Sequence, residues 1–310
     1  MSNPTGGCYL CHEKNLEVLQ DFSWLVKCAN CGIVFNPHLS IDSREVSNQF
    51  YDERNMAHRR KIRSILQRVA RSRWRWMQKR IAVPAGSLLE IGCGTGEFLA
   101  IARDSGWKVD GLELSKSFRD AARSWYDLEL KGQELSQAGL LSGSFDVVAL
   151  LHVFEHLPNP LDFLTRIAEI VKPGGWLFIV VPNLSSWTDA LFGKSSPTLI
   201  KRDHFFHYSP DTLKRMVAHT DFTPVDIVTL EPKHHLWTSL YGFLSLRNSS
   251  MQDGSVTVAR GATASLIGKT KSNLPYWAGA WTSILLFPWR LWLHKTDRGH
   301  EIYLLCRRHP

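Results

Sequence analysis

The residues with the clearest chemical meaning form a glycine-rich turn after a short apolar run. The turn reads Glu90, Ile91, Gly92, Cys93, Gly94, Thr95 and Gly96, and a segment with helical spacing follows it. Glycine permits a positive φ and lets a ligand approach the backbone, and the start of a helix offers unpaired N–H groups. The pattern therefore predicts a strand, a ligand-binding turn and a helix.

An acidic residue lies at the spacing at which a carboxylate meets ribose hydroxyls. Glu113 ends a second apolar run about 20 residues after the turn, and Leu114 follows it as a further candidate contact. Glu97 occupies the position at which a dinucleotide-binding turn has its third glycine, which argues against a pyrophosphate. We therefore expect an adenosine ligand without phosphates, with Glu113 on the ribose.

Four cysteines near the start of the chain have metal-ligand spacing. Cys8 and Cys11 form one pair and Cys28 and Cys31 a second, so each pair presents two thiols from one tight turn. The N-terminus shows no secretion signal, and in a reducing compartment such pairs favour metal over disulfides. We predict a structural zinc ribbon. Four reduced thiols without metal are the alternative, and His12 is the weaker candidate ligand.

An α/β fold must position these residues. Apolar runs predict strands at 88–91, 109–113, 128–131, 145–151 and 176–182, and helices at 97–105, 117–125 and 161–171 lie between them. Such alternation predicts a parallel sheet with helices on both faces and with ligands at the carboxyl ends of the strands. Apolar runs at 222–228 and 299–306 predict two further strands, which gives seven in all.

Three segments resemble motifs of the class I S-adenosylmethionine-dependent methyltransferases. Residues 90–96 are similar to the first motif, and residues 172–183 to the fifth strand and the turn before it. Residues 145–157 resemble the fourth strand and loop of the branch that includes ubiquinone-biosynthesis and sugar methyltransferases. The resemblance implies a Rossmann-like, seven-stranded sheet whose last strand, at 299–306, is antiparallel. It also implies S-adenosylmethionine as cofactor, with its methionine end at Glu90 and the glycine turn.

The same resemblance implies methyl transfer to an oxygen, or less readily a carbon or nitrogen, of a small or lipid-linked acceptor such as a glycan or a quinone-like ring. His152 directly follows the fourth strand, which would place it at the cofactor or the acceptor. Some related sugar methyltransferases have a proposed base near the acceptor; His204 matches it by position, and His207 is the second candidate. The alternative is that these histidines only hold loops by hydrogen bonds.

The family contact to adenine after the third strand has no clear counterpart in this chain. The usual aspartate is missing, so Gln133 or Glu134 is the candidate.

A basic helical segment, residues 39–82, separates the ribbon from the first strand. Apolar residues recur at helical intervals, and ten Arg and Lys residues between Arg59 and Arg80 fill the other faces. A solvated face is one interpretation and an anionic partner is the other. The resemblance implies that this segment covers the cofactor as a lid, with Phe50 and Tyr51 at its border.

An apolar, Trp-rich insert at 232–298 separates the last two strands. Its segment 276–295 is interrupted by Pro288 and Arg290, so we expect contact with a membrane interface rather than a span. A hairpin that covers the acceptor pocket and a dimer interface are the alternatives.

The composition sets further bounds on function. The net charge of +8 is spread along the chain outside the one helix, which makes nucleic acid an unlikely partner. We expect three parts: a zinc ribbon at 1–38, a basic helical lid at 39–82 and a methyltransferase domain at 83–310. The expected location is the cytoplasm, or the inner face of the membrane as a peripheral protein. A non-catalytic module that retains the cofactor and recruits nucleic acid or protein through the ribbon and basic helix is the alternative; the oligomeric state is not indicated.

Overall fold

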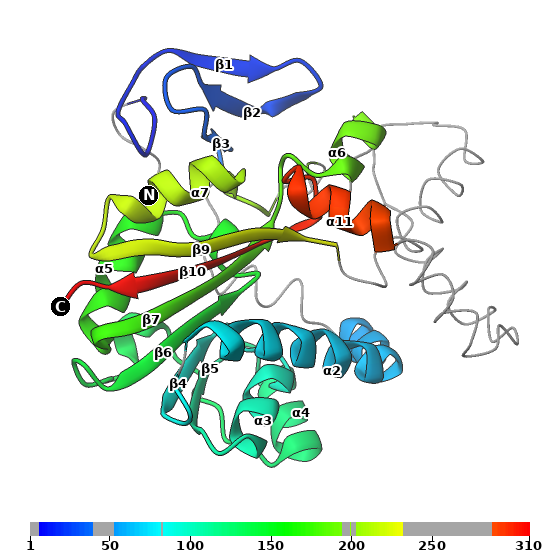
Figure 1. The fold of residues 1–310 in the computed structure, drawn as a ribbon, viewed down its shortest axis with the longest axis vertical. Helices are drawn as coiled ribbons and strands as arrows, with labels where there is room; N and C mark the ends of the chain where they lie inside the picture. Colours follow the sequence, from blue (N-terminus) through cyan, green and yellow to red (C-terminus); the bar gives the residue numbers. More distant parts are fainter. Residues whose placement is uncertain (1–5, 40–52, 82, 194–198, 200–202, 232–286) are drawn as a thin grey trace, which may run out of the picture.

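The computed structural model describes residues 6–39, 53–81, 83–193, 199, 203–231 and 287–310 (Figure 1). Its centre is a six-stranded sheet with the order β5-β4-β6-β7-β10-β9. The strands are β4 (Ser87–Ile91), β5 (Lys108–Leu112), β6 (Phe145–Leu151), β7 (Val171–Pro182), β9 (Phe222–Leu230) and β10 (Glu301–Arg308). Strands β4 to β7 are parallel, and β10 is antiparallel to both of its neighbours, as predicted.

The predicted third strand is the one difference in this sheet. Within the described residues, the segment 128–131 forms only an isolated parallel bridge between Lys131 and Leu112. Lys131 exchanges hydrogen bonds with the edge of β5, accepting from Glu113 and donating to Gly111, and the pairing then ends. The Arg119 guanidinium lies against the next residue, Gly132, where an added Cβ would come within 2.7 Å of it. The described sheet thus has six strands, and the prediction of a further short strand at its edge was wrong.

Helices cover both faces of the sheet. On one face lie α5 (Pro160–Ile170) and α7 (Pro210–Ala218), and on the other lie α2 (Glu53–Ile81), α3 (Glu97–Asp104) and α4 (Lys116–Tyr126) (Figure 1). The central strands are mostly apolar because both of their faces are buried. The predicted doubly covered α/β fold is confirmed.

Helix α2 packs on the sheet along its second half. Ala70, Trp74, Met77 and Ile81 recur on one side of the helix and are buried. Trp74 meets the rings of Phe98 and Trp107 at 5.6 Å. The helix is thus a structural layer of the domain. Phe50 and Tyr51, the predicted border of the lid, lie outside the described residues.

The N-terminal ribbon contains β1 (Leu16–Leu19), β2 (Phe22–Cys28) and β3 (Val34–Phe35). Its sheet has a fourth strand, β8 (Phe206–His207), which pairs with β3 although the two strands lie far apart in the sequence. Ribbon side chains belong to the same apolar cluster as α5, α7 and one face of the main sheet. The ribbon is therefore built into the domain.

Most of the Trp-rich insert, residues 232–286, lies outside the described residues. Helix α11 (Phe287–Lys295) forms its end, where Trp289 meets Trp187 edge to face at 5.1 Å. Leu291 and Trp292 are exposed and Leu293 is buried. Among the helices that the structure describes, none combines the length and apolar character that crossing a membrane requires. Membrane contact through 276–295 stays a prediction.

Candidate functional site

The glycine turn follows β4 at the carboxyl edge of the sheet. Gly92 and Gly96 have φ values of 68° and 83°, in the left-handed region that glycine favours. A Cβ on Gly96 would lie 2.9 Å from Leu128, so the turn packs closely where α3 begins. Cys93 and Thr95, the other predicted residues of the turn, are buried beneath it.

Glu113 joins this turn to the end of β5. Its carboxylate accepts hydrogen bonds from the backbone N–H groups of Gly94 and Ser115, both at 2.8 Å. Burial raises the pKa of Glu113, and these two hydrogen bonds oppose the rise. Each carboxylate oxygen can accept a further hydrogen bond, so a ribose contact remains compatible with this position.

The other candidate contacts to the nucleoside lie on neighbouring loops. Leu114 follows Glu113 and is half-buried. Gln133 is exposed and Glu134 is half-buried, and both follow the bridge at Lys131. All three residues belong to loops beside the end of β5.

Glu90 lies near the end of β4 and is 3% exposed, and its Oε2 has no hydrogen-bond partner among the described residues. Burial is the main cause that raises the pKa of Glu90 well above its ordinary value, and the nearby carboxyl of Glu97 adds to it. A buried acid with an unsatisfied oxygen is stabilised by a cation. The ammonium and sulfonium groups of S-adenosylmethionine would supply positive charge here, so the residues fit this cofactor.

Two arginines of α2 reach the site, whereas the sequence left open whether the cations of this helix form a solvated face or meet an anionic partner. Arg59 donates to the Thr95 hydroxyl at 3.2 Å, and its guanidinium lies 4.5 Å from the centre of the Phe118 ring. Arg73 donates to Glu301 on β10 at 2.9 Å. Helical spacing could have revealed Arg59, because it extends the stripe formed by Ala70 and Met77.

His152 follows β6 and contacts the same ion pair. Its backbone is left-handed, with φ 58°, which is strained for a residue with a side chain. Its Nε2 lies 3.0 Å from Glu301 Oε1 and 2.7 Å from Arg73 Nη2. Partial burial disfavours the charged ring, but the carboxylates of Glu155 and Glu301 outweigh it and raise the pKa of His152. A histidine that binds its proton more tightly is a less available base.

The other two predicted histidines, His204 and His207, belong to a cluster that contains the buried carboxylate of Glu155. Glu155 and His156, in the short helix η2 (Phe154–His156), come together with His204, so that one ligand atom of each lies within 4.8 Å of the others. The rings of His156 and His204 are 4.7 Å apart, and His207 is 5.5 Å from His204. His204 and His207 are each 2% exposed. The structure thus groups His204 and His207 with Glu155 and His156.

This histidine cluster is held by backbone and ring hydrogen bonds. Phe205 N–H donates to the Glu155 carbonyl at 2.8 Å, which ties the two loops together. His156 Nδ1 lies 2.9 Å from the Asp203 carbonyl, to which it can only donate, so its Nε2 is left as the acceptor in the neutral ring. The cluster has the groups required for proton transfer, and its three ligand atoms also have a spacing that could hold a cation.

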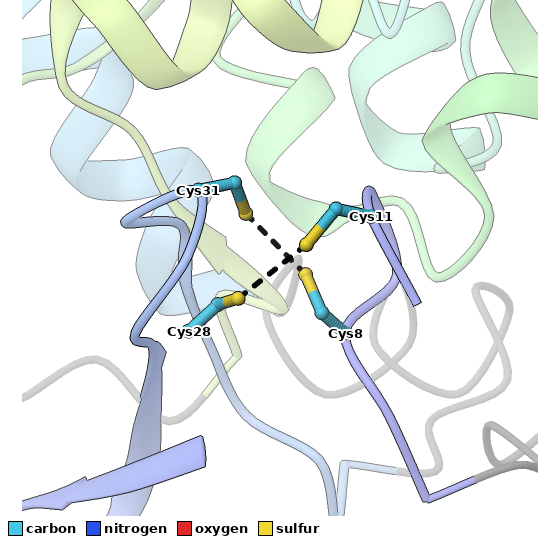
Figure 2. Close-up of side chains that lie close together, drawn as sticks. All are labelled: Cys8, Cys11, Cys28 and Cys31. Carbon is cyan, nitrogen blue, oxygen red and sulfur yellow. Dashed lines mark hydrogen bonds between the residues drawn. The ribbon is translucent and has the colours of Figure 1, made fainter. Parts of the chain in front are cut away.

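The four predicted zinc ligands lie together in the ribbon (Figure 2). The sulfurs of Cys8 and Cys31 are 3.5 Å apart, as are those of Cys11 and Cys28, and all four are free thiols. A tetrahedral zinc with bonds of about 2.3 Å brings sulfurs to about this separation. The four residues therefore fit a structural zinc. His12 is exposed beside them, with φ 59°.

Comparisons with known proteins agree with this architecture. A family model described as a methyltransferase domain matches residues 54–227. The ubiquinone biosynthesis O-methyltransferase of Thiobacillus denitrificans is 33% identical over 118 residues, which cover 36% of this chain and 50% of that protein. The enzyme of the same name from Vibrio parahaemolyticus is 30% identical over 157 residues, which cover 46% and 66%.

The chain thus spans about half to two thirds of the length of these curated relatives. A solved SAM-dependent methyltransferase from Archaeoglobus fulgidus shares the fold, with a TM-score of 0.51 and 18% identity over 83% of this chain and all of that one. The family model covers more than half of the chain and includes the glycine turn, Glu113, the β6 loop and the histidine cluster. The chain belongs to the methyltransferase-domain family.

Proposed function

We propose that this enzyme methylates an oxygen of a small acceptor, namely a hydroxyl on a quinone-like ring. The observation that supports it best is the histidine cluster, which combines a buried carboxylate and three imidazoles beside the end of β6. A hydroxyl must lose a proton when it is methylated, and such a cluster can accept one. The names of the curated relatives support an oxygen acceptor and a quinone-like ring.

The proposed cofactor contacts use residues of three loops. When bound, S-adenosylmethionine supplies a methyl group on a sulfonium, which is already a strong electrophile. Glu90 and the turn from Gly92 to Gly96 would hold the methionine end, Glu113 would accept a hydrogen bond from the ribose, and Leu114 with Gln133 or Glu134 would contact the nucleoside. The protein then mainly has to orient the acceptor and exclude water.

On the acceptor side we propose His204 as the base. Its ring touches His156, and Glu155 lies close enough to stabilise an imidazolium that forms on this cluster. His207 is the second candidate. His152 is less suitable, because the carboxylates of Glu155 and Glu301 raise its pKa and so favour the protonated ring, and its contact with Glu301 holds the ring in place.

The experiment is a methyl-transfer assay with three acceptor classes. Isotope-labelled S-adenosylmethionine is incubated with the full chain and with a dihydroxylated ring, a free sugar or a lipid-linked glycan, and products are identified by mass spectrometry. We expect an O-methylated ring, at least about tenfold less product with His204→Asn, and no change with the exposed His219→Asn. Product from a glycan alone would replace the ring proposal. Cofactor binding without any methylated product would support the non-catalytic module.

A further inference from the structure

The ribbon shares a strand with the segment that contains the candidate base. Strand β3 pairs with β2 on one side and with β8 on the other, where Val34 faces His207 and Phe35 faces Phe206. Strands β3 and β8 contain two residues each. Such short pairing is marginal alone and depends on what supports each strand. On the β3 side, that support is the ribbon.

Backbone hydrogen bonds continue this connection into the site. Asn36 N–H of the ribbon donates to the Phe205 carbonyl at 2.9 Å, and Phe205 N–H donates to the Glu155 carbonyl at 2.8 Å. Phe205 is thus held between the ribbon and the loop after β6. The residue before Phe205 is His204, the candidate base. The backbone position of His204 therefore depends on the two hydrogen bonds that Phe205 makes with the ribbon and with the loop after β6.

A series of aromatic contacts reinforces the junction. Tyr9 lies between the first two cysteines, and its ring meets Phe35 at 5.2 Å and Phe206 at 5.4 Å. Phe206 in turn stacks with Tyr208 at 5.9 Å, and Tyr208 stacks on Phe154 at 5.3 Å. These rings run from the cysteine turn of the ribbon to η2, where Glu155 and His156 lie.

A second cysteine turn is also tied to the domain. The carbonyl of Cys31 accepts from Arg215 of α7 at 3.3 Å. The first cysteine turn therefore contacts β8 through Tyr9, and the second contacts α7, the helix that follows β8 in the chain.

We propose that the metal-binding ribbon is a structural part of the acceptor side: through Tyr9 and β3 it holds β8 and thereby positions His204 and His207 beside Glu155 and His156. The functional meaning of this placement rests on the proposed function. The structural dependence of β8 on the ribbon does not, and it can be measured without turnover. Tyr9 is a positioning residue, because it acts only through β8.

The test is amide hydrogen exchange on the full chain, followed by mass spectrometry. Tyr9→Ala leaves all four cysteines in place and removes two ring contacts, so metal content should not change. We expect exchange in peptides that cover 205–208 to be at least about tenfold faster, and exchange in 87–104 to be unchanged. Val18→Ala, on an exposed residue of β1, is the control and should leave both regions as in the parent.

Two further measurements separate the possible outcomes. Affinity for S-adenosylmethionine, measured by titration, should be the same in Tyr9→Ala and the parent, because none of the hydrogen bonds that the structure describes at the glycine turn and Glu113 involves a ribbon residue. Removal of the metal by a chelator should accelerate 205–208 more than Tyr9→Ala does. Unchanged exchange in 205–208 in both samples would overturn the proposal. If the metal-free protein unfolds completely, the exchange rate of 205–208 in Tyr9→Ala alone tests the proposal. A lack of methyl transfer would refute the proposed function and leave the exchange result standing.

Discussion

Arg73 provides the strictest test of how α2 packs on the sheet. Its guanidinium and the Glu301 carboxylate are 2.9 Å apart, with side chains 13% and 3% exposed. Arg73→Met keeps most of the apolar stem of the side chain but removes its charge. The Glu301 carboxylate then stays buried without its arginine partner. Loss of one partner of a buried pair costs about 3–5 kcal/mol. Because His152 remains 3.0 Å from the same oxygen, we expect the lower end, about 3 kcal/mol of unfolding free energy.

Urea unfolding of the cofactor-free protein, followed by fluorescence and circular dichroism, measures this loss. Arg75→Met on the exposed side of the same helix is the matched control and should change stability by less than about 0.5 kcal/mol. Since Arg73 lowers the pKa of His152, the substitution should also raise that pKa, which an NMR titration can follow. If Arg73→Met lost no more stability than Arg75→Met, the buried ion pair would be refuted.

Three further predictions concern the metal and the cofactor. Purified protein should contain about one zinc per chain, and Cys28→Ser should lose it together with the fold of the ribbon; metal analysis with circular dichroism checks this, and an intact metal-free ribbon would contradict it. Glu113→Ala should weaken S-adenosylmethionine about 10- to 100-fold in isothermal titration, since a hydrogen bond to a charged group contributes about 1.5–3 kcal/mol, and the exposed Glu129→Ala should have no effect. Because burial raises the pKa of Glu90, the folded state keeps a proton that the unfolded state has released, so stability should fall as pH rises from the ordinary glutamate range toward the raised folded pKa. Urea midpoints across this range should fall less in Glu90→Gln, and parallel profiles would exclude Glu90 as the cause.

Features set by local spacing were predictable from the sequence. The glycine turn and each of the two cysteine pairs depend on residues that lie within a few positions of one another, and the acid after the second strand lies only about 20 residues beyond the turn. The parallel order of the sheet followed from the alternation of strands and helices, and the antiparallel last strand followed from the family resemblance. The structure agrees with these expectations because the turn, the pairs and the alternation do not depend on distant partners.

Features that join distant segments were not predictable. Strand β8 has two residues, too few for any periodicity, and its partner β3 lies in another part of the chain. Arg73, His152 and Glu301 come from three elements, and only the folded sheet brings them together. The strand prediction for 128–131 was wrong for a related reason. An apolar run resembles a strand in the sequence, but whether it pairs along its length depends on the folded sheet, and here it forms a single bridge.

Strand β8 also has a consequence for how the chain is made. The cysteines leave the ribosome early, but the ribbon sheet can be completed only after residue 207 has been synthesised. Metal capture and completion of the sheet are therefore separate events during synthesis, and the late pairing is a long-range contact of the kind that slows folding. Deleting the N-terminal ribbon would not be a neutral truncation, because β8 would become an unpaired edge next to exposed aromatic rings, a surface prone to aggregation.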